Sequence, residues 1–209
     1  ERKSMPMTEE DKEITAYHES GHALVGHVMP HSDPIHKVTI LPRGGAAGVT
    51  WSLPKDDKHH QSANMIKDYL AQVVGGRVVE EIIYGEGNIN TGASNDLMKA
   101  TAVARSYIVE FGMSPKLKNL AFKEDRDPFD ISGSGSTKTS YSGKTAEIID
   151  EEVQRLVSEA TERARKVILA NRKHLDALKD ALLKKETIDE EEINKILKDA
   201  KAPKEVLLS

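Results

Sequence analysis

The sequence predicts a mainly α-helical protein with one short β-hairpin and a C-terminal helical bundle. Apolar residues recur with a helical period over most of the 209 residues, whereas only two short stretches have the character of strands. Aromatic residues make up 4% of the chain and charged residues 31%. That balance favours cores of Ala, Leu, Ile and Val beneath well-solvated faces. A chain of this length forms one large domain or two small ones.

The charge and the composition exclude several classes of protein. A net charge of −4 offers no basic surplus for phosphate groups, so we expect no nucleic-acid partner. The absence of cysteine excludes disulfides and cysteine zinc sites, and a reducing compartment fits best. No signal peptide and no apolar run of about 18 residues is present, so the fragment is expected to be soluble. The chain starts at Glu1 rather than at methionine, which suggests a piece of a longer polypeptide.

The first helix is expected to begin after Thr8 and to end before Pro30. Thr8 is a suitable N-cap, and Asp11 three residues later is a weaker substitute for the Glu or Gln of a capping box. Acidic residues crowd the first turns, where the helix dipole favours them. Pro30 cannot continue the helix.

This helix contains a motif of the form H-E-x-x-H, Tyr17-His18-Glu19-Ser20-Gly21-His22. On a helix, His18 and His22 project from one face and can occupy two corners of a tetrahedral Zn²⁺ site. Glu19 lies beside them, able to reach a water molecule at the metal without being a ligand, as a zinc peptidase requires. The competing interpretation is a partly buried helix whose histidines only pair with neighbouring groups.

A third zinc ligand has to come from elsewhere, because catalytic zinc usually keeps three protein ligands. The extended pattern H-E-x-x-H-x-x-G-x-x-H fails, since it requires Gly and His where the chain has Val25 and Val28. His27 lies five residues after His22, well round the helix, and is not expected to be a ligand. We therefore expect a carboxylate from another part of the chain.

A β-hairpin is expected after the first helix. Residues 36–40 alternate and are rich in β-branched types, 42–45 form a turn, and 48–51 form the second strand. An exposed strand edge near a protease site can bind an extended substrate, although a simple capping hairpin is an equal alternative. His59 and His60 follow in a polar run that is more typical of a solvated loop than of a metal site.

The next expected helix spans residues 62–84, with Ser62 as its N-cap. The pair Gly75-Gly76 in its interior would permit the close approach of another backbone, here that of the first helix. Glu80 and Glu81 lie on this helix and are two candidate ligands for the metal.

A further helix is expected up to Phe111-Gly112, with Ser94 or Thr91 as its cap. Asp96 falls in its first turn and is the third candidate ligand. The alternative for Asp96 is an ordinary acid favoured there by the helix dipole. Spacing alone does not choose between this residue, Glu80 and Glu81.

Residues 124–143 are polar and rich in Gly and Ser, which predicts a mobile loop, either a lid or an unconstrained connection. The string Gly143-Lys144-Thr145 does not complete a phosphate-binding loop, because Lys138 stands where that motif needs glycine. A helical bundle is expected over residues 144–200. Its helices begin at Thr145, after the cap Asn171 and after the capping box Thr187-Ile188-Asp189-Glu190, and residues 201–209 follow as a tail.

Taken together, several stretches in one order resemble the peptidase domain of FtsH-type proteases, which are membrane-anchored AAA+ zinc metalloproteases. Together they cover most of residues 8–190: His18-Glu19-Ser20-Gly21-His22-Ala23-Leu24, Leu41-Pro42-Arg43-Gly44 to Gly48-Val49-Thr50, Leu53-Pro54, Gly75-Gly76-Arg77 to Glu80-Glu81-Ile82, Thr91-Gly92-Ala93-Ser94-Asn95-Asp96, Phe111-Gly112-Met113-Ser114 and Glu186-Thr187-Ile188. Ser20 and Ala47 depart from the family pattern, at positions that are not ligands.

The resemblance implies that Asp96 is the third zinc ligand. Glu80 and Glu81 would then serve the structure or support the ligands, and zinc content should survive the replacement of either. Zn²⁺, one ion per chain, would be held by His18, His22 and Asp96, with Glu19 as the general base.

The resemblance also implies an arrangement of domains and partners. Residues 1–7 would be a linker remnant and 8–200 the peptidase domain, with catalytic helices over 8–123. Polypeptides would be its substrates and a homohexamer its assembly. ATP would act only through an N-terminal ATPase module that, like the transmembrane segments, is missing from this chain. The full-length protein would lie in the bacterial inner membrane with this domain on the cytoplasmic side. The alternative is a non-catalytic helical assembly module with a structural metal site.

Overall fold

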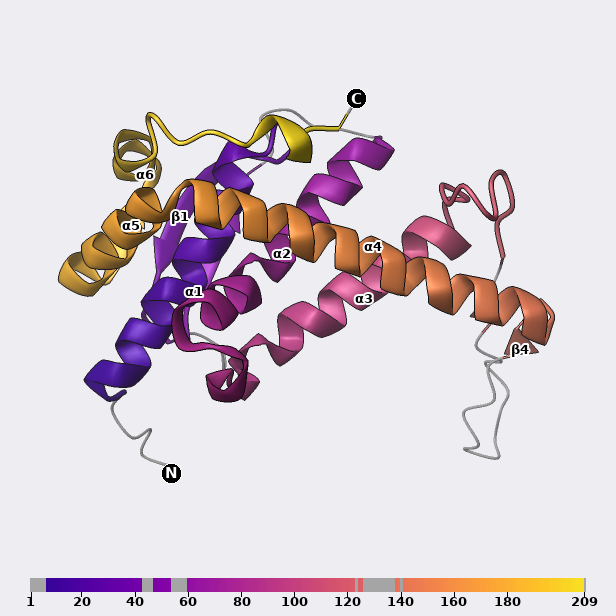
Figure 1. The fold of residues 1–209 in the computed structure, drawn as a ribbon, viewed down its shortest axis with the longest axis horizontal. Helices are drawn as coiled ribbons and strands as arrows, with labels where there is room; N and C mark the ends of the chain where they lie inside the picture. The colour runs from indigo at the N-terminus through magenta and orange to yellow at the C-terminus, as the bar shows by residue number, and fades with distance from the viewer. Residues whose placement is uncertain are drawn as a thin grey trace.

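A computed structural model describes residues 7–42, 47–53, 60–122, 124–125, 138–139 and 141–208. Helices dominate this part of the chain, so the mainly α prediction is confirmed (Figure 1). The α-helices are α1 (Glu9–Val28), α2 (Ala63–Tyr84), α3 (Ser94–Val109), α4 (Gly143–Ala170), α5 (Arg172–Lys185) and α6 (Glu190–Ile196). Short 3₁₀ turns are η1 (Glu86–Asn88), η2 (Thr91–Ala93) and η3 (Lys204–Val206). Within the described ranges, no helix combines the length and the apolar character needed to cross a bilayer.

The predicted hairpin is confirmed and gains a third strand from the far end of the chain. Strands β1 (Ile35–Thr39), β2 (Val49–Ser52) and β5 (Thr187–Asp189) are antiparallel in the order β2-β1-β5. The third strand was not predicted. Glu186 has the left-handed φ of 59° that turns the chain back at the end of α5. The predicted capping role of Thr187 is wrong, because it lies in β5 and Asp189 caps α6 instead.

Parts of four sequence predictions lie outside the described residues. These are residues 1–6 of the predicted linker remnant, most of the 42–45 turn, His59, and residues 126–137 and 140 of the predicted loop. Within that loop, β3 (Glu124–Asp125) pairs antiparallel with β4 (Lys138–Thr139).

Of the five predicted helix caps, two make the expected hydrogen bond, and the one at Thr187 is wrong, as its place in β5 shows. Thr8 and Ser62 each accept a hydrogen bond from the backbone N–H three residues later. Neither Thr91 nor Ser94 caps α3, because η2 runs directly into the helix and leaves an alanine at the N-cap position without a side-chain bond. Asn171 makes no cap bond to α5; its side chain bonds to backbone oxygens of α4 and of the C-terminal segment.

Helices α1 and α2 approach each other closely at Gly75, as the pair Gly75-Gly76 predicted, and the partner on α1 is Gly21. A Cβ atom on Gly21 would lie 2.6 Å from the carbonyl oxygen of Gly75, and one on Gly75 would lie 2.8 Å from the carbonyl oxygen of Gly21. Only hydrogen at these positions lets the two backbones approach so closely. This contact fixes α2 against the face of α1 that bears the H-E-x-x-H motif.

Helix α4 crosses over α2 and α3, while α5 packs on α1 (Figure 1). The buried stripe of α4 follows the helical period through Leu156, Ala160, Ala164, Val167 and Ile168. The same core includes α5, so the predicted C-terminal bundle and the motif-bearing helices share one hydrophobic interior.

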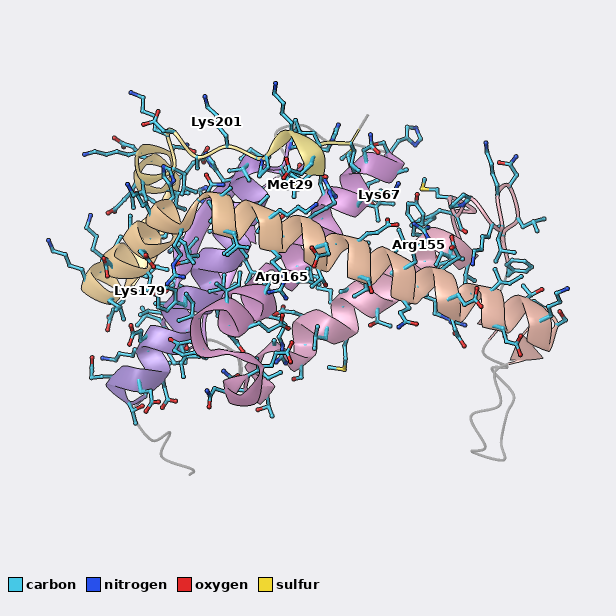
Figure 2. All side chains as sticks on the ribbon, in the orientation of Figure 1. Met29, Lys67, Arg155, Arg165, Lys179 and Lys201 are labelled. Carbon is cyan, nitrogen blue, oxygen red and sulfur yellow. The ribbon has the colours of Figure 1, made fainter. Side chains whose placement is uncertain are left out.

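A buried ion pair joins distant parts of the chain beneath α4. The Asp68 carboxylate, fully buried on α2, pairs with the guanidinium of Arg163 on α4. Arg163 also donates to the carbonyl oxygens of Lys67 and Val206, at 3.2 and 2.9 Å. Figure 2 shows Met29 and Lys67 close to this part of α4. The C-terminal segment, predicted as a tail, is therefore held to the bundle.

Candidate metal centre

Helix α1 presents His18 and His22 on one face, one turn apart. Their Nε2 atoms lie 3.0 Å from each other. His22 is 9% exposed and the His18 side chain 12% exposed, so both rings are largely shielded from water. The helical spacing predicted this arrangement.

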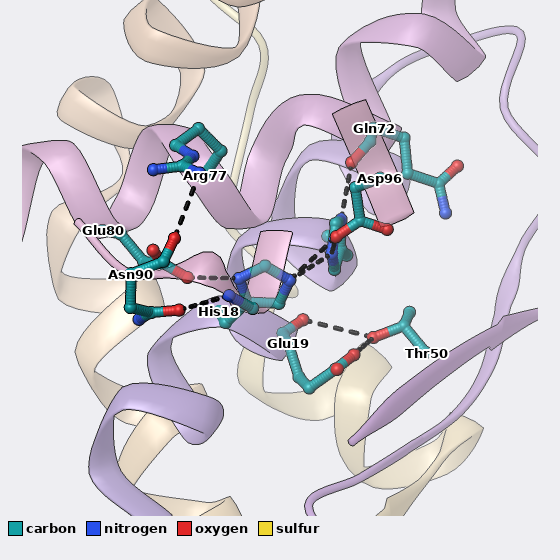
Figure 3. Close-up of polar contacts among 10 residues, drawn as sticks. His18, Glu19, Thr50, Gln72, Arg77, Glu80, Asn90 and Asp96 are labelled. Atoms are coloured by element: carbon teal, nitrogen blue, oxygen red, sulfur yellow. Dashed lines mark hydrogen bonds and ion pairs between the residues drawn. The ribbon is translucent and has the colours of Figure 1, made fainter. Parts of the chain in front are cut away.

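Asp96 reaches the two histidines from the first turn of α3. Its Oδ2 lies 3.0 Å from Nε2 of His18 and 3.4 Å from Nε2 of His22 (Figure 3). Among the described residues, these three form the one group of His, Cys, Asp or Glu side chains whose ligand atoms gather closely enough to hold an ion. Glu80 and Glu81 offer no atom to this group.

The other ring nitrogens are fixed by acceptors on α2. Nδ1 of His22 lies 2.9 Å from the carbonyl oxygen of Gln72. Because a carbonyl only accepts, Nδ1 of His22 donates and Nε2 keeps its lone pair. Nδ1 of His18 lies 2.7 Å from Oε1 of Glu80, which is buried on α2. This contact holds the His18 ring so that its Nε2 also faces the cluster. The sequence offered Glu80 as a candidate ligand, but it gave no sign of the Gln72 contact, because every residue type has a backbone carbonyl oxygen.

The donor atoms suit a zinc-type ion. In a tetrahedral site with bonds of about 2.1 Å, two ligand atoms lie about 3.4 Å apart. The separations of 3.0, 3.0 and 3.4 Å among Nε2 of His18, Nε2 of His22 and Oδ2 of Asp96 are close to that value. Two imidazoles and one carboxylate are also the donor types that zinc accepts.

Two pKa shifts show how strongly this cluster favours a cation. Burial, the largest single influence, lowers the pKa of His18, but hydrogen bonds to Asp96 and Glu80 outweigh it and raise the pKa to about 9. Burial likewise raises the pKa of Asp96, and hydrogen bonds from His18 and His22 hold it well below its usual range. A metal ion would take the place of the proton between these groups.

Asp96 is positioned by the loop that joins α2 to α3. Nη2 of Arg77 donates to the carbonyl oxygen of Asn90 at 3.2 Å. The Asn90 side chain in turn accepts from the backbone N–H of Gly92 at 2.6 Å, which shapes turn η2 (Figure 3). Because η2 leads directly into α3, these bonds set the direction from which Asp96 approaches α1.

Glu19 lies beside the cluster and outside its group of ligand atoms. It is 6% exposed and its Oε2 accepts a hydrogen bond of 2.6 Å from Oγ1 of Thr50 on β2. Glu81 and His27 also lie outside the group of ligand atoms. Glu81 pairs with Arg165 of α4, and burial lowers the pKa of His27.

A mainly helical fold whose H-E-x-x-H helix meets a carboxylate from a second helix is the arrangement expected of a metallopeptidase. The sequence profile of peptidase family M41 matches residues 5–196, and the chain belongs to this family.

Curated relatives support the same family. The chain is 45% identical over 197 residues to the ATP-dependent zinc metalloprotease FtsH of Haemophilus influenzae, covering 94% of this chain and 31% of the relative. It is 46% identical over 198 residues to FtsH of Buchnera aphidicola subsp. Baizongia pistaciae, covering 95% and 32%. The relative in Synechocystis, FtsH 3, is 42% identical over 200 residues, covering 94% and 32%. The chain thus spans about a third of the length of these relatives.

Proposed function

We propose that this chain is the catalytic part of a zinc-dependent endopeptidase. The convergence of Nε2 of His18, Nε2 of His22 and Oδ2 of Asp96 supports the proposal, with the Glu19 carboxyl group beside them. Catalytic zinc sites keep three protein ligands and one open position, and three ligand groups are available here for one ion per chain. The relatives named above are called zinc metalloproteases.

The residues of the site divide the work of peptide hydrolysis. A zinc ion held there would supply Lewis-acid chemistry, which polarises a peptide carbonyl and makes water more acidic. Glu19 takes a proton from the attacking water at its carboxylate and returns it to the leaving nitrogen. Glu80 and the carbonyl of Gln72 hold the histidine rings in the orientation in which Nε2 faces the ion.

Strand β2 supplies a place for an extended polypeptide substrate. Within the described sheet it has one partner strand, β1, and Thr50 in its middle contacts Glu19. A peptide added along β2 would gain backbone hydrogen bonds and pass beside the catalytic groups. This favours the substrate-binding interpretation of the hairpin over a capping role.

The test is to compare the wild-type chain with Glu19→Gln and Asp96→Ala, using elemental analysis and cleavage of unfolded casein. Glu19→Gln should keep its zinc and lose cleavage, whereas Asp96→Ala should lose most of its zinc. A chelator should stop wild-type cleavage, and added zinc should restore it. Turnover by Glu19→Gln would refute the role of that residue. A wild-type chain that binds zinc and cleaves nothing would instead support the non-catalytic assembly module.

For the complete protein, we propose that residues 8–200 are the peptidase unit of an ATP-dependent, membrane-anchored protease. The ATPase module and the membrane segments would precede this unit, six copies would assemble, and the peptidase would face the cytoplasm of a bacterium. The support is the family membership and the names of the relatives, ATP-dependent zinc metalloproteases. Full-length protein should degrade a folded substrate only with ATP and should have the mass of a hexamer; degradation without ATP would contradict this.

A further inference from the structure

The hydroxyl of Thr50 lies against the carboxyl group of Glu19. Oγ1 of Thr50 is 2.6 Å from Oε2 of Glu19 and 3.3 Å from the Glu19 carbonyl oxygen (Figure 3). A hydroxyl has one hydrogen to donate, and 2.6 Å is the length of a charge-assisted bond from O–H to a carboxylate. The carboxylate oxygen therefore receives the hydrogen.

The same residue is part of the strand that borders the site. Thr50 pairs with Val38 of β1, so the backbone of β2 determines where the hydroxyl lies. Gly48, two residues earlier, lets the strand lie close to Glu19, since a Cβ atom there would be 2.8 Å from both Cγ and Oε1 of Glu19. The Glu19 side chain is thus held at Oε2 by the hydroxyl and flanked at Cγ and Oε1 by Gly48, the residue just before β2.

We propose that Thr50 is a positioning residue for the reaction. Its hydroxyl holds Oε2 of Glu19, so that Oε1 is the oxygen that takes the proton, and it ties the placement of Glu19 to strand β2. A glutamate has several rotatable bonds, and a displacement of about 1 Å in a catalytic group can reduce a rate about 100-fold. This inference rests on the proposed function, because it takes Glu19 as the base.

The test compares Thr50→Val with Thr50→Ser. Valine removes the hydroxyl, keeps the volume and is a good strand former, so kcat should fall about 10- to 100-fold with KM changed less than about twofold. Serine keeps the hydroxyl and forms strands less well, so kcat should stay within about threefold of wild type. If Thr50 only supported the strand, Thr50→Ser would lower kcat more than Thr50→Val does. Thr50→Ala, which also lacks the hydroxyl, should match valine and replaces it if the valine variant does not fold.

Thr39→Val is the matched control. Thr39 lies on β1 and is buried, and its hydroxyl bonds to the Glu186 carbonyl and to Thr187 rather than to Glu19. The Thr39→Val variant should be less stable than the wild type, and its folded form should have the wild-type kcat. Zinc content, measured on every variant, should be unchanged.

A spectroscopic measurement tests the same bond without activity. In metal-free protein labelled with ¹³C at the glutamate side-chain carboxyl, the Glu19 signal is identified by its loss in Glu19→Gln. It should shift in Thr50→Val and remain in place in Thr50→Ser and Thr39→Val. An unshifted signal, an undiminished kcat in Thr50→Val, or equal losses for valine and serine would each overturn the inference. Turnover by Glu19→Gln would instead overturn the proposed function itself.

Discussion

Replacing Glu80 should weaken zinc binding without removing a ligand. Oε1 of Glu80 lies 2.7 Å from Nδ1 of His18, and the residue is 1% exposed, so water cannot replace its carboxylate. Loss of such an outer partner typically costs 10- to 100-fold in metal affinity, or about 1.4 to 2.7 kcal/mol. Glu80→Gln keeps the volume and one acceptor oxygen but loses the charge, so we expect about a 10-fold loss. Glu80→Ala removes the acceptor oxygens as well as the charge, so the loss of zinc affinity should approach 100-fold.

The assay is competition for zinc against a chromophoric chelator at fixed pH, on variants whose folding is checked by circular dichroism. Glu81→Gln is the matched control, because Glu81 is the next residue and pairs with Arg165 at 2.5 Å. Its affinity should equal that of the wild type. From the sequence alone both replacements were expected to leave zinc content intact; the contact with His18 changes that expectation for Glu80. Wild-type affinity in both Glu80 variants would refute the reasoning.

Three further predictions concern stability and the shape of the site. Arg163→Met removes the guanidinium partner of the buried Asp68 carboxylate, which keeps only its contacts with the backbone N–H and Nδ1 of His31. The free energy of unfolding, measured with urea, should fall by about 3 kcal/mol, and Asp68→Leu in the same chain should restore part of it. Gly76→Ala would place a methyl group 2.5 Å from the His18 ring, so zinc affinity should fall even though alanine favours the helix. A glycine-to-alanine change on an open helix face, such as Gly143→Ala, should leave zinc affinity unchanged. Burial lowers the pKa of His27, so neutral His27 stabilises the fold above about pH 6.5, and this contribution is lost as the pH falls. The wild type should therefore lose more stability between pH 7 and pH 5 than His27→Gln does. Equal losses in the two proteins would contradict this prediction.

The local features of the site could be predicted from the sequence because they depend on neighbours along the chain. His18 and His22 share a face since any helix brings residues four apart together. Thr8 and Ser62 cap their helices through bonds that reach only three residues. Where a cap depended on the preceding turn, as at the start of α3, the prediction failed, because η2 left no extended residue to serve as a cap.

The features that join distant segments needed the tertiary structure. Strand β5 pairs with β1 across some 150 residues, and no local pattern distinguished Thr187–Asp189 from the start of a helix. The contact of Thr50 with Glu19 depends on how β2 lies over α1, which alternation within the strand does not specify.

The sequence by itself determined the H-E-x-x-H helix, the mainly α class and, through resemblance, the family. Spacing left Glu80, Glu81 and Asp96 as equal candidates, and the resemblance alone favoured the third. Only the packing of α1 on α2 and α3 brought Oδ2 of Asp96 to the histidine nitrogens and directed Glu80 to the far side of the His18 ring. The physical reason is that helix formation is local, whereas a metal site depends on the distances between helices, which the close contact of Gly21 with Gly75 sets.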